Sequence, residues 1–204
     1  FLNGRIDLAQ AEAIIDIINA KSAREAQESA NQLEGFLSKK INEIKVDNIA
    51  VGAEVNSVAV QNGIVAIAIQ AAQKTDTGYV GFYQANDLKY ISHVDVGALP
   101  DMLTFTPDGK TVLVANEAEP SNDYQIDPEG SISTINIQDL NRPSVKIADF
   151  KAFNGQEQQL RNKGIRIFGP NATAAQDFEP EYITVSKDGK TAWDTEKYSW
   201  HEIE

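Results

Sequence analysis

PDMLTFTPDGKT, residues 100–111, is the stretch that decides the fold, and it recurs as PEYITVSKDGKT at residues 180–191. Each copy is an apolar run, a polar turn with an Asp-Gly pair, and the start of a second apolar run, which is the pattern of a β-hairpin. A weaker copy runs from Asn56 through Asn62-Gly63 to Ile67. The first two copies are 80 residues apart, and the weaker copy lies about 45 residues before the first. Propeller blades typically repeat about every 40–50 residues, so these offsets suit two blades and one blade. We therefore expect residues 46–193 to form an antiparallel, all-β partial propeller of about three blades.

A partial propeller of this size leaves part of a sheet uncovered. Closed propellers have four or more blades, and each blade must pack against its neighbours to bury both faces. We expect a protein partner or missing propeller blades to cover the remaining face or edge. The alternative is a complete β-sandwich with recurrent Asp-Gly hairpins.

Residues 1–45 have a different, helical pattern. Asp7 is a candidate cap for a first helix, and Ser22 with Glu25 forms a capping box that opens a second one. We expect an antiparallel helix pair, a domain junction near residues 44–50, and an α+β chain overall. The apolar positions recur every three or four residues in both helices: Leu8, Ala11, Ile15 and Ile18, then Ala26, Ala30, Leu33, Leu37, Ile41 and Ile44.

The composition excludes several classes of function. The 204 residues include 18 Lys and Arg against 30 Asp and Glu, for a net charge of −12, so nucleic acid is an unlikely partner by charge. Cysteine is absent, which excludes disulfides, thiolate metal sites and cysteine nucleophiles. No run of about 18 apolar residues is present, so we expect no membrane span.

Motifs for nucleotide binding and nucleophilic catalysis are incomplete. The two Asp-Gly-Lys-Thr sequences look like the end of a phosphate-binding loop, but Thr104 and Thr184 stand where that loop needs a glycine. His93 and His201 are not accompanied by a Gly-x-Ser-x-Gly elbow. Asp177 and Glu179 could act as an acid/base pair, although solvated loop carboxylates are the simpler interpretation. We therefore predict no catalytic residue.

The segment 116–129 is the candidate metal site. It contains five carboxylates and no basic residue, and hard oxygen ligands of this kind suit Ca²⁺. Their spacing differs from that of an EF-hand, and a solvated acidic loop is the alternative. The candidate ligands are Glu117, Glu119, Asp123, Asp127 and Glu129.

The first 45 residues resemble the helical domain of the MnmE (TrmE) tRNA-modification GTPases. The resemblance is carried by FLNGRIDLAQAEAI at 1–14, LEG at 33–35 and LSKKI at 37–41. It implies wobble-uridine modification with GTP, a formyl-folate-type donor and a flavoprotein partner, and it makes Arg5 a candidate ligand-binding residue of the folate site. The folate-binding domain, GTPase domain and terminal cysteine of that family have no counterpart here, so we do not expect this chain to perform the reaction.

Residues 48–193 resemble the choice-of-anchor I group of bacterial surface and secreted proteins. The resemblance implies a periplasmic or extracellular propeller related in shape to phytase-like and lactonase-like propellers. Residues 194–204 fit neither family and remain an unassigned tail. The resemblance is carried by VNSVAV at 55–60, GALPDML at 97–103, VANE at 114–117, DPEGS at 127–131, FNGQE at 153–157 and RIFGP at 166–170.

Two such resemblances in one sequence indicate a chimera or composite chain. The resemblance that covers most of the chain favours a non-enzymatic extracellular or surface binding module of propeller type, which carries a helical appendage. One alternative is a fragment of the tRNA-modification GTPase, acting in assembly or in folate or tRNA binding, and cytoplasmic. The other is a metal-dependent, phytase-like or lactonase-like hydrolase.

Overall fold

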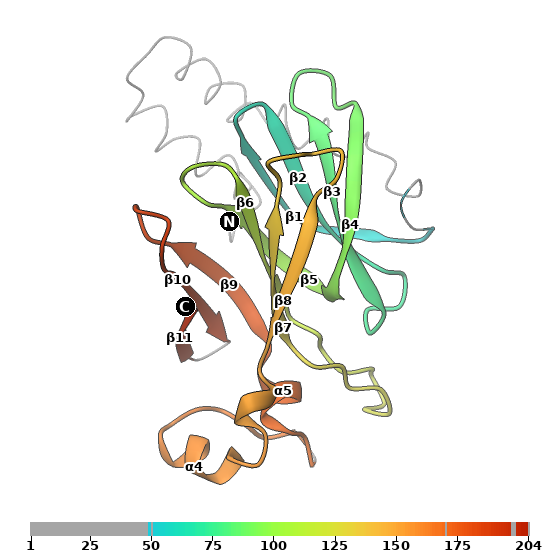
Figure 1. The fold of residues 1–204 in the computed structure, drawn as a ribbon. Coiled ribbons are helices and arrows are strands. Elements are labelled where there is room, and N and C mark those ends of the chain that lie inside the picture. Colours follow the sequence, from blue (N-terminus) through green and yellow to red (C-terminus); the bar gives the residue numbers. More distant parts are fainter. Residues whose placement is uncertain (1–48, 50, 170, 197–198, 204) are drawn as a thin grey trace, which may run out of the picture. The chain divides into compact units, whose positions relative to one another are not determined.

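The computed structural model describes residues 49, 51–169, 171–196 and 199–203, and they are mostly β-structure. The helix pair expected over 1–45, and Arg5 with it, lies outside these residues. The described part contains three antiparallel sheets, here called sheets A, B and C, and no closed propeller (Figure 1). The prediction of antiparallel β-sheets is confirmed, although the described part is mostly rather than entirely β. Three sheets are one more than the alternative, a simple sandwich, would have.

Each sheet follows the order of the chain, so neighbouring strands are joined by hairpins or short loops. Sheet A contains β1 (Glu54–Gln61), β2 (Ile64–Gln70), β3 (Thr77–Gln84) and β4 (Tyr90–Ala98). Sheet B contains β5 (Pro100–Phe105), β6 (Thr111–Asn116), β7 (Ser131–Asn136) and β8 (Ser144–Asp149). Sheet C contains β9 (Pro180–Val185), β10 (Ala192–Glu196) and β11 (Ser199–Ile203).

The two Asp-Gly sequences form the same turn. In each, an aspartate Oδ1 accepts hydrogen bonds from a hydroxyl group two residues before it and from a backbone N–H two residues after it, at 2.7 and 3.1 Å for Asp108 and 2.6 and 3.2 Å for Asp188. Gly109 and Gly189 have φ of +68° and +70°, a conformation that glycine adopts without strain. These contacts explain both sequences as hairpin turns, as predicted.

Sheet B lies between sheets A and C and is buried on both faces. Val112 and Val114 of β6 pack with Phe82 of sheet A, whereas Leu113 and Ala115 of the same strand pack with residues of sheet C. Successive side chains of a strand point to opposite faces, which is why one strand contributes to two cores. Sheet B therefore holds the three sheets together.

The first strands of the sheets meet through a recurring contact. The N–H of Leu103 in β5 donates to Ser57 Oγ of β1 at 3.3 Å, and the N–H of Ile183 in β9 donates to Met102 Sδ of β5 at 3.4 Å. Leu103 and Ile183 occupy equivalent positions in the two copies of the repeat. The repeat thus extends to the junctions between sheets.

Three short helices, which were not predicted from the sequence, interrupt the β-structure between β8 and β9. They are η2 (Lys151–Phe153), α4 (Glu157–Asn162) and α5 (Ala174–Asp177). Helices of three to six residues are too short to show helical periodicity; α5 depends instead on a capping box between Thr173 and Gln176. Of the described helices, none is long and apolar enough to cross a membrane.

The tail also takes part in a sheet. Residues 194–204 fit neither family resemblance, yet β10 continues to Glu196 and β11 pairs with it in antiparallel register. The strand pattern therefore persists beyond the point where the family resemblance ends.

Candidate functional site

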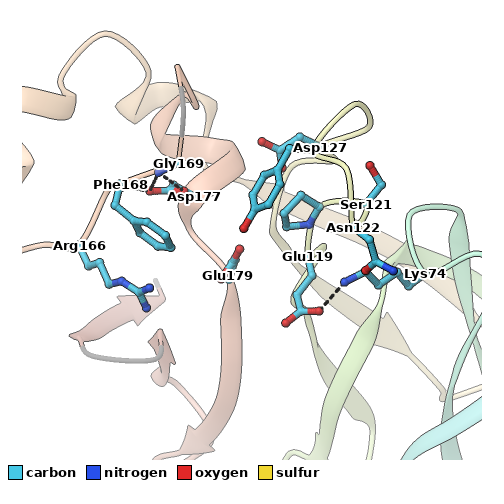
Figure 2. A pocket seen from close by; sticks show the side chains of 12 residues that line it. Lys74, Glu119, Ser121, Asn122, Asp127, Arg166, Phe168, Gly169, Asp177 and Glu179 are labelled. Carbon is cyan, nitrogen blue, oxygen red and sulfur yellow. Dashed lines mark hydrogen bonds and ion pairs between the residues drawn. The ribbon is translucent and has the colours of Figure 1, made fainter.

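A pocket of about 320 Å³ opens between two walls of the β-rich part (Figure 2). One wall is the loop between β6 and β7 together with Lys74 from the loop between β2 and β3. The other wall is the segment between α4 and β9. The side chains that line the pocket are Lys74, Glu119, Pro120, Ser121, Asn122, Tyr124, Asp127, Arg166, Phe168, Asp177 and Glu179, with Gly169.

Two hydrogen bonds join the segments that form the two walls. The Gly130 N–H donates to the Ala175 carbonyl oxygen at 2.9 Å, and Gln176 Nε2 donates to the Asp127 carbonyl oxygen at 3.0 Å. A Cβ atom at position 130 would overlap the Phe178 carbonyl oxygen, so this close approach requires glycine. The segment 127–130 is therefore part of the architecture of the pocket.

Asp177 organises the second wall. Its carboxylate accepts hydrogen bonds from the backbone N–H groups of Phe168 and Gly169, which holds the preceding loop against α5. The Arg166 guanidinium lies 3.9 Å from the centroid of the Phe168 ring, a cation–π contact. The Phe168 residue is nevertheless 57% exposed, so it remains accessible to a ligand.

Negative charge dominates the pocket. Four carboxylates line it against two basic side chains, Arg166 and Lys74, and Lys74 Nζ lies 2.7 Å from Glu119 Oε2. Burial, followed by the nearby Asp177 carboxylate, raises the pKa of Asp127. Charge repulsion of this kind favours the approach of a cation. The pocket is therefore suited to a positively charged ligand.

The five predicted calcium ligands are divided among different environments. Glu119 and Asp127 line the pocket, whereas Glu129 lies apart from its lining, with Oε2 3.1 Å from Lys151 Nζ. Asp123 is exposed and accepts hydrogen bonds from Ser121 Oγ and the Gln125 N–H, which lower its pKa. Among the described residues, no group of three acidic or histidine side chains is already arranged around a metal position. Calcium binding stays a prediction.

Glu117 differs from the other four. It follows β6 directly, its residue surface is only 8% exposed, and its backbone N–H donates to the Leu99 carbonyl oxygen at 2.9 Å. Burial is the largest cause that raises its pKa, to about 8, and nearby carboxylates add to it. A carboxyl group with such a pKa is a candidate functional residue.

The other residues considered from the sequence have ordinary roles or become part of the pocket. His93 Nδ1 lies 2.6 Å from Tyr90 Oη in β4, away from the pocket lining. His201 lies in β11, and Asp177 and Glu179 both line the pocket. Asp177 is engaged by two backbone N–H groups, which is a structural role.

Sequence reasoning missed the cationic and aromatic side chains of the pocket. Lys74 lies about 45 residues from its partner Glu119, and nothing in either local pattern connects them.

Comparison with known proteins gives two kinds of similarity. The chain is 66% identical over 44 residues to the tRNA modification GTPase MnmE of Caldicellulosiruptor saccharolyticus, covering 22% of this chain and 10% of that protein. It is 58% identical over 57 residues to MnmE of Clostridioides difficile, covering 27% of this chain and 12% of that protein. The chain thus spans about a tenth of the length of these curated relatives.

Among solved structures, the chain is similar to hydrazine synthase of Kuenenia stuttgartiensis, with a TM-score of 0.42 and 12% identity over 68% of this chain and 35% of that one. It is also similar to a chain in the complex of KlAtg21 with the coiled coil of AgAtg16. The TM-score is 0.44, with 11% identity over 78% of this chain and 41% of that one. The choice-of-anchor I domain profile matches residues 9–195, which begins within the stretch that resembles the MnmE proteins. Because this match covers most of the sequence, the chain belongs to the choice-of-anchor I domain family.

Proposed function

We propose that the β-rich part is a non-enzymatic binding module of a secreted or surface protein, and that its pocket binds a positively charged segment of a partner protein. Choice-of-anchor domains are typical of secreted and surface proteins, which supports this location. The observation that carries the proposal is the pocket itself, in which four carboxylates outnumber two basic side chains, Lys74 and Arg166, beside two exposed aromatic residues.

The chemistry of the pocket matches lysine and arginine side chains. Asp127, Asp177 and Glu179 supply negative charge. The Tyr124 ring supplies a face that attracts cations, as the Phe168 ring already does for Arg166. The Tyr124 and Phe168 residues are 56% and 57% exposed. A basic segment would find both kinds of contact within one pocket, whereas an acidic segment would be repelled.

We further interpret sheets A, B and C as successive blades of an incomplete propeller. The recurring contacts of Ser57 with Leu103 and of Met102 with Ile183 support this interpretation. In both, the backbone N–H at the same position of the repeat donates to a side chain in the first strand of the preceding sheet. Further blades, from a partner or from the rest of a longer protein, would then complete the ring.

Peptide titration tests the proposed function. A fluorescent hexalysine peptide is titrated into the full chain, and we expect saturable binding that weakens as salt is added. Asp127→Asn combined with Glu179→Gln should lower the affinity at least about tenfold, the change expected from about 1.4 kcal/mol of lost interaction. Asp139→Asn, at an exposed turn outside the pocket lining, is the matched control and should bind as the original chain does.

Two outcomes would contradict the proposal. Equal binding of a hexaglutamate peptide would show that charge does not select the ligand. Calcium-dependent turnover of p-nitrophenyl phosphate or of a simple lactone, lost in the same double variant, would instead support the phytase-like or lactonase-like alternative and make the protein an enzyme.

The similarity to MnmE over 44 residues at 66% identity favours a second candidate function for the N-terminal segment. In that case the helical appendage would act in assembly with a GTPase or flavoprotein, or in folate or tRNA binding. Folate binding that disappears in Arg5→Ala, or salt-sensitive tRNA binding, would support it. The absence of both at micromolar protein concentration would exclude it.

A further inference from the structure

The short helix α5 is the point at which the two walls of the pocket are joined. Its Asp177 carboxylate accepts hydrogen bonds from the N–H groups of Phe168 and Gly169 (Figure 2). On the other side, the Gln176 side chain donates to the Asp127 carbonyl oxygen at 3.0 Å. Asp127, Phe168 and Asp177 all line the pocket. The position of α5 therefore determines how the lining side chains are spaced.

Helix α5 cannot hold this position by itself. It has four residues, and helices this short do not form in isolation. The first backbone N–H groups of a helix have no partner within the helix. Here the first two belong to Ala174 and Ala175, which are both 0% exposed, and a buried N–H without a partner is unfavourable. Both groups therefore need acceptors from elsewhere in the chain.

Asn154 and Glu157 supply these acceptors. Asn154 Oδ1 accepts from the Ala175 N–H at 2.9 Å, and Glu157 Oε1 accepts from the Ala174 N–H at 3.2 Å. The same Glu157 oxygen accepts from the Gly155 N–H at 2.8 Å. Hydrogen bonds from backbone N–H groups, chiefly those of Glu157 itself and Gly155, lower the pKa of Glu157, so its carboxylate is ionised at neutral pH. The segment before and at the start of α4 thus holds α5 through two side chains.

Neither Asn154 nor Glu157 is among the residues that line the pocket. A change at either position leaves the carboxylates and aromatic rings of the pocket chemically unaltered. It removes instead an acceptor for a backbone N–H one or two residues before Gln176, the residue through which α5 contacts the first wall. Any effect on a ligand must therefore pass through α5.

We propose that Asn154 and Glu157 are positioning residues of the pocket. By accepting the first two N–H groups of α5, they fix the spacing of the two walls and thereby the affinity for a positively charged ligand. This inference rests on the function proposed above, and it extends that function to residues outside the pocket lining.

Amide hydrogen exchange of the full chain, followed by NMR without any ligand, tests the positioning. In Glu157→Ala we expect the Phe168, Gly169 and Ala174 amides to exchange at least about tenfold faster, because local opening becomes easier. Glu157→Gln should restore most of the protection, since one oxygen accepts both hydrogen bonds and glutamine keeps such an oxygen. Asn154→Ala is a second variant should Glu157→Ala fail to fold, and it should act in the same direction.

The affinity for the hexalysine peptide tests the consequence for the ligand. Glu157→Ala should bind at least about fivefold more weakly than Glu157→Gln, a loss of about 1 kcal/mol. The two variants lose the same charge, so their difference excludes long-range attraction between the chain and the peptide as the cause. Gly189→Ala, in a hairpin turn outside the pocket lining, controls for a general loss of stability and should bind as the original chain does.

The outcomes separate this inference from the proposed function. Unchanged exchange of the Phe168 and Gly169 amides in both Glu157→Ala and Asn154→Ala would overturn the positioning role, whether or not the peptide binds. Equal peptide affinity in Glu157→Ala and Glu157→Gln would overturn it as well, because α5 would then not control the ligand. Faster exchange in Glu157→Ala, together with no peptide binding by the original chain, would support the positioning of the walls and contradict only the proposed function.

Discussion

The two copies of the repeat fold into the same turn but continue into strands whose buried side chains differ. Val114 of β6 and Asp194 of β10 occupy equivalent positions, three residues after the turn, and both are 0% exposed. Val114 packs with the core between sheets A and B. Asp194 lies on the same face of β10 as Ala192 and opposite Ile183, two residues of the core between sheets B and C.

This difference shows that turn and strand depend on different physical causes. The turn needs only an aspartate, a hydroxyl group and a glycine with positive φ, all within six residues, so each copy forms it independently of its surroundings. The strand depends on the sheet against which it packs. An apolar residue and a carboxyl group at one repeat position therefore have very different effects on stability.

The largest expected effect comes from transferring the second copy's residue into the first. Val114→Asp should lower the free energy of unfolding by about 3–5 kcal/mol, because it places a carboxylate in an apolar core between two sheets. Urea unfolding followed by circular dichroism measures the change. Ile147→Asp, at a position of β8 that is 55% exposed, is the control and should change stability by less than about 0.5 kcal/mol.

The reverse exchange should have a smaller effect. Asp194→Val replaces a fully buried carboxyl group, which has an interaction partner within the protein, with the residue found in the first copy. We expect a loss of about 1–3 kcal/mol in the free energy of unfolding, because removing one member of a buried interaction leaves the other unsatisfied. Asp194→Asn, which removes the charge but keeps a polar group, should give a smaller loss. A gain of stability in Asp194→Val would show that apolar packing outweighs the interaction of this carboxyl group.

The sequence predicted what is local. The hairpins at Asn62-Gly63, Asp108-Gly109 and Asp188-Gly189 follow from turn residues whose chemistry is contained in a few positions. The acidic loop was also found, because its charge is visible in the composition of the segment 116–129. Repetition of the hairpins then indicated several antiparallel sheets.

The site required information from distant residues. Arg166 and Phe168 belong to a segment without periodicity, and Asp177 holds it in place through hydrogen bonds that no spacing rule predicts. Glu117 and Asp123 look equivalent in the sequence, yet the first is buried beside β5 and β9 and the second is exposed in its own turn. Which acid of a loop is buried is decided by tertiary packing.

The turns offer a finer comparison, through their glycines. Gly109→Ala and Gly189→Ala should each destabilise the protein by about 1–2 kcal/mol, because alanine is strained at positive φ. The loss should be larger at Gly109, where a Cβ atom would collide with the Asn62 side chain, than at Gly189, where the nearest atom is Pro107 Cδ at 3.5 Å. Asn62→Gly in the Gly109→Ala background should reduce the difference, and urea unfolding of the four chains provides the measurement. Equal losses at the two positions would indicate that Asn62 moves aside freely.

The smallest expected effect concerns the turn aspartates. Hydrogen bonds from the Thr106 and Ser186 hydroxyl groups are the largest cause that lowers the pKa of Asp108 and Asp188, and backbone N–H groups add to it. A carboxyl group whose pKa is lowered on folding stabilises the protein at pH above its ordinary value of 3.8, and this contribution is lost as the pH falls through the lowered pKa.

Carboxyl ¹³C NMR titration from pH 7 to pH 2 should show both pKa values below 3.8. Thr106→Val should raise the pKa of Asp108 alone, and Ser186→Ala that of Asp188 alone. Asp108 also has the Lys110 ammonium 3.9 Å away, so added salt should raise its pKa more than that of Asp188. If salt affects both equally, the two turns are electrostatically as well as geometrically alike, and the difference between the copies begins only in the strands that follow.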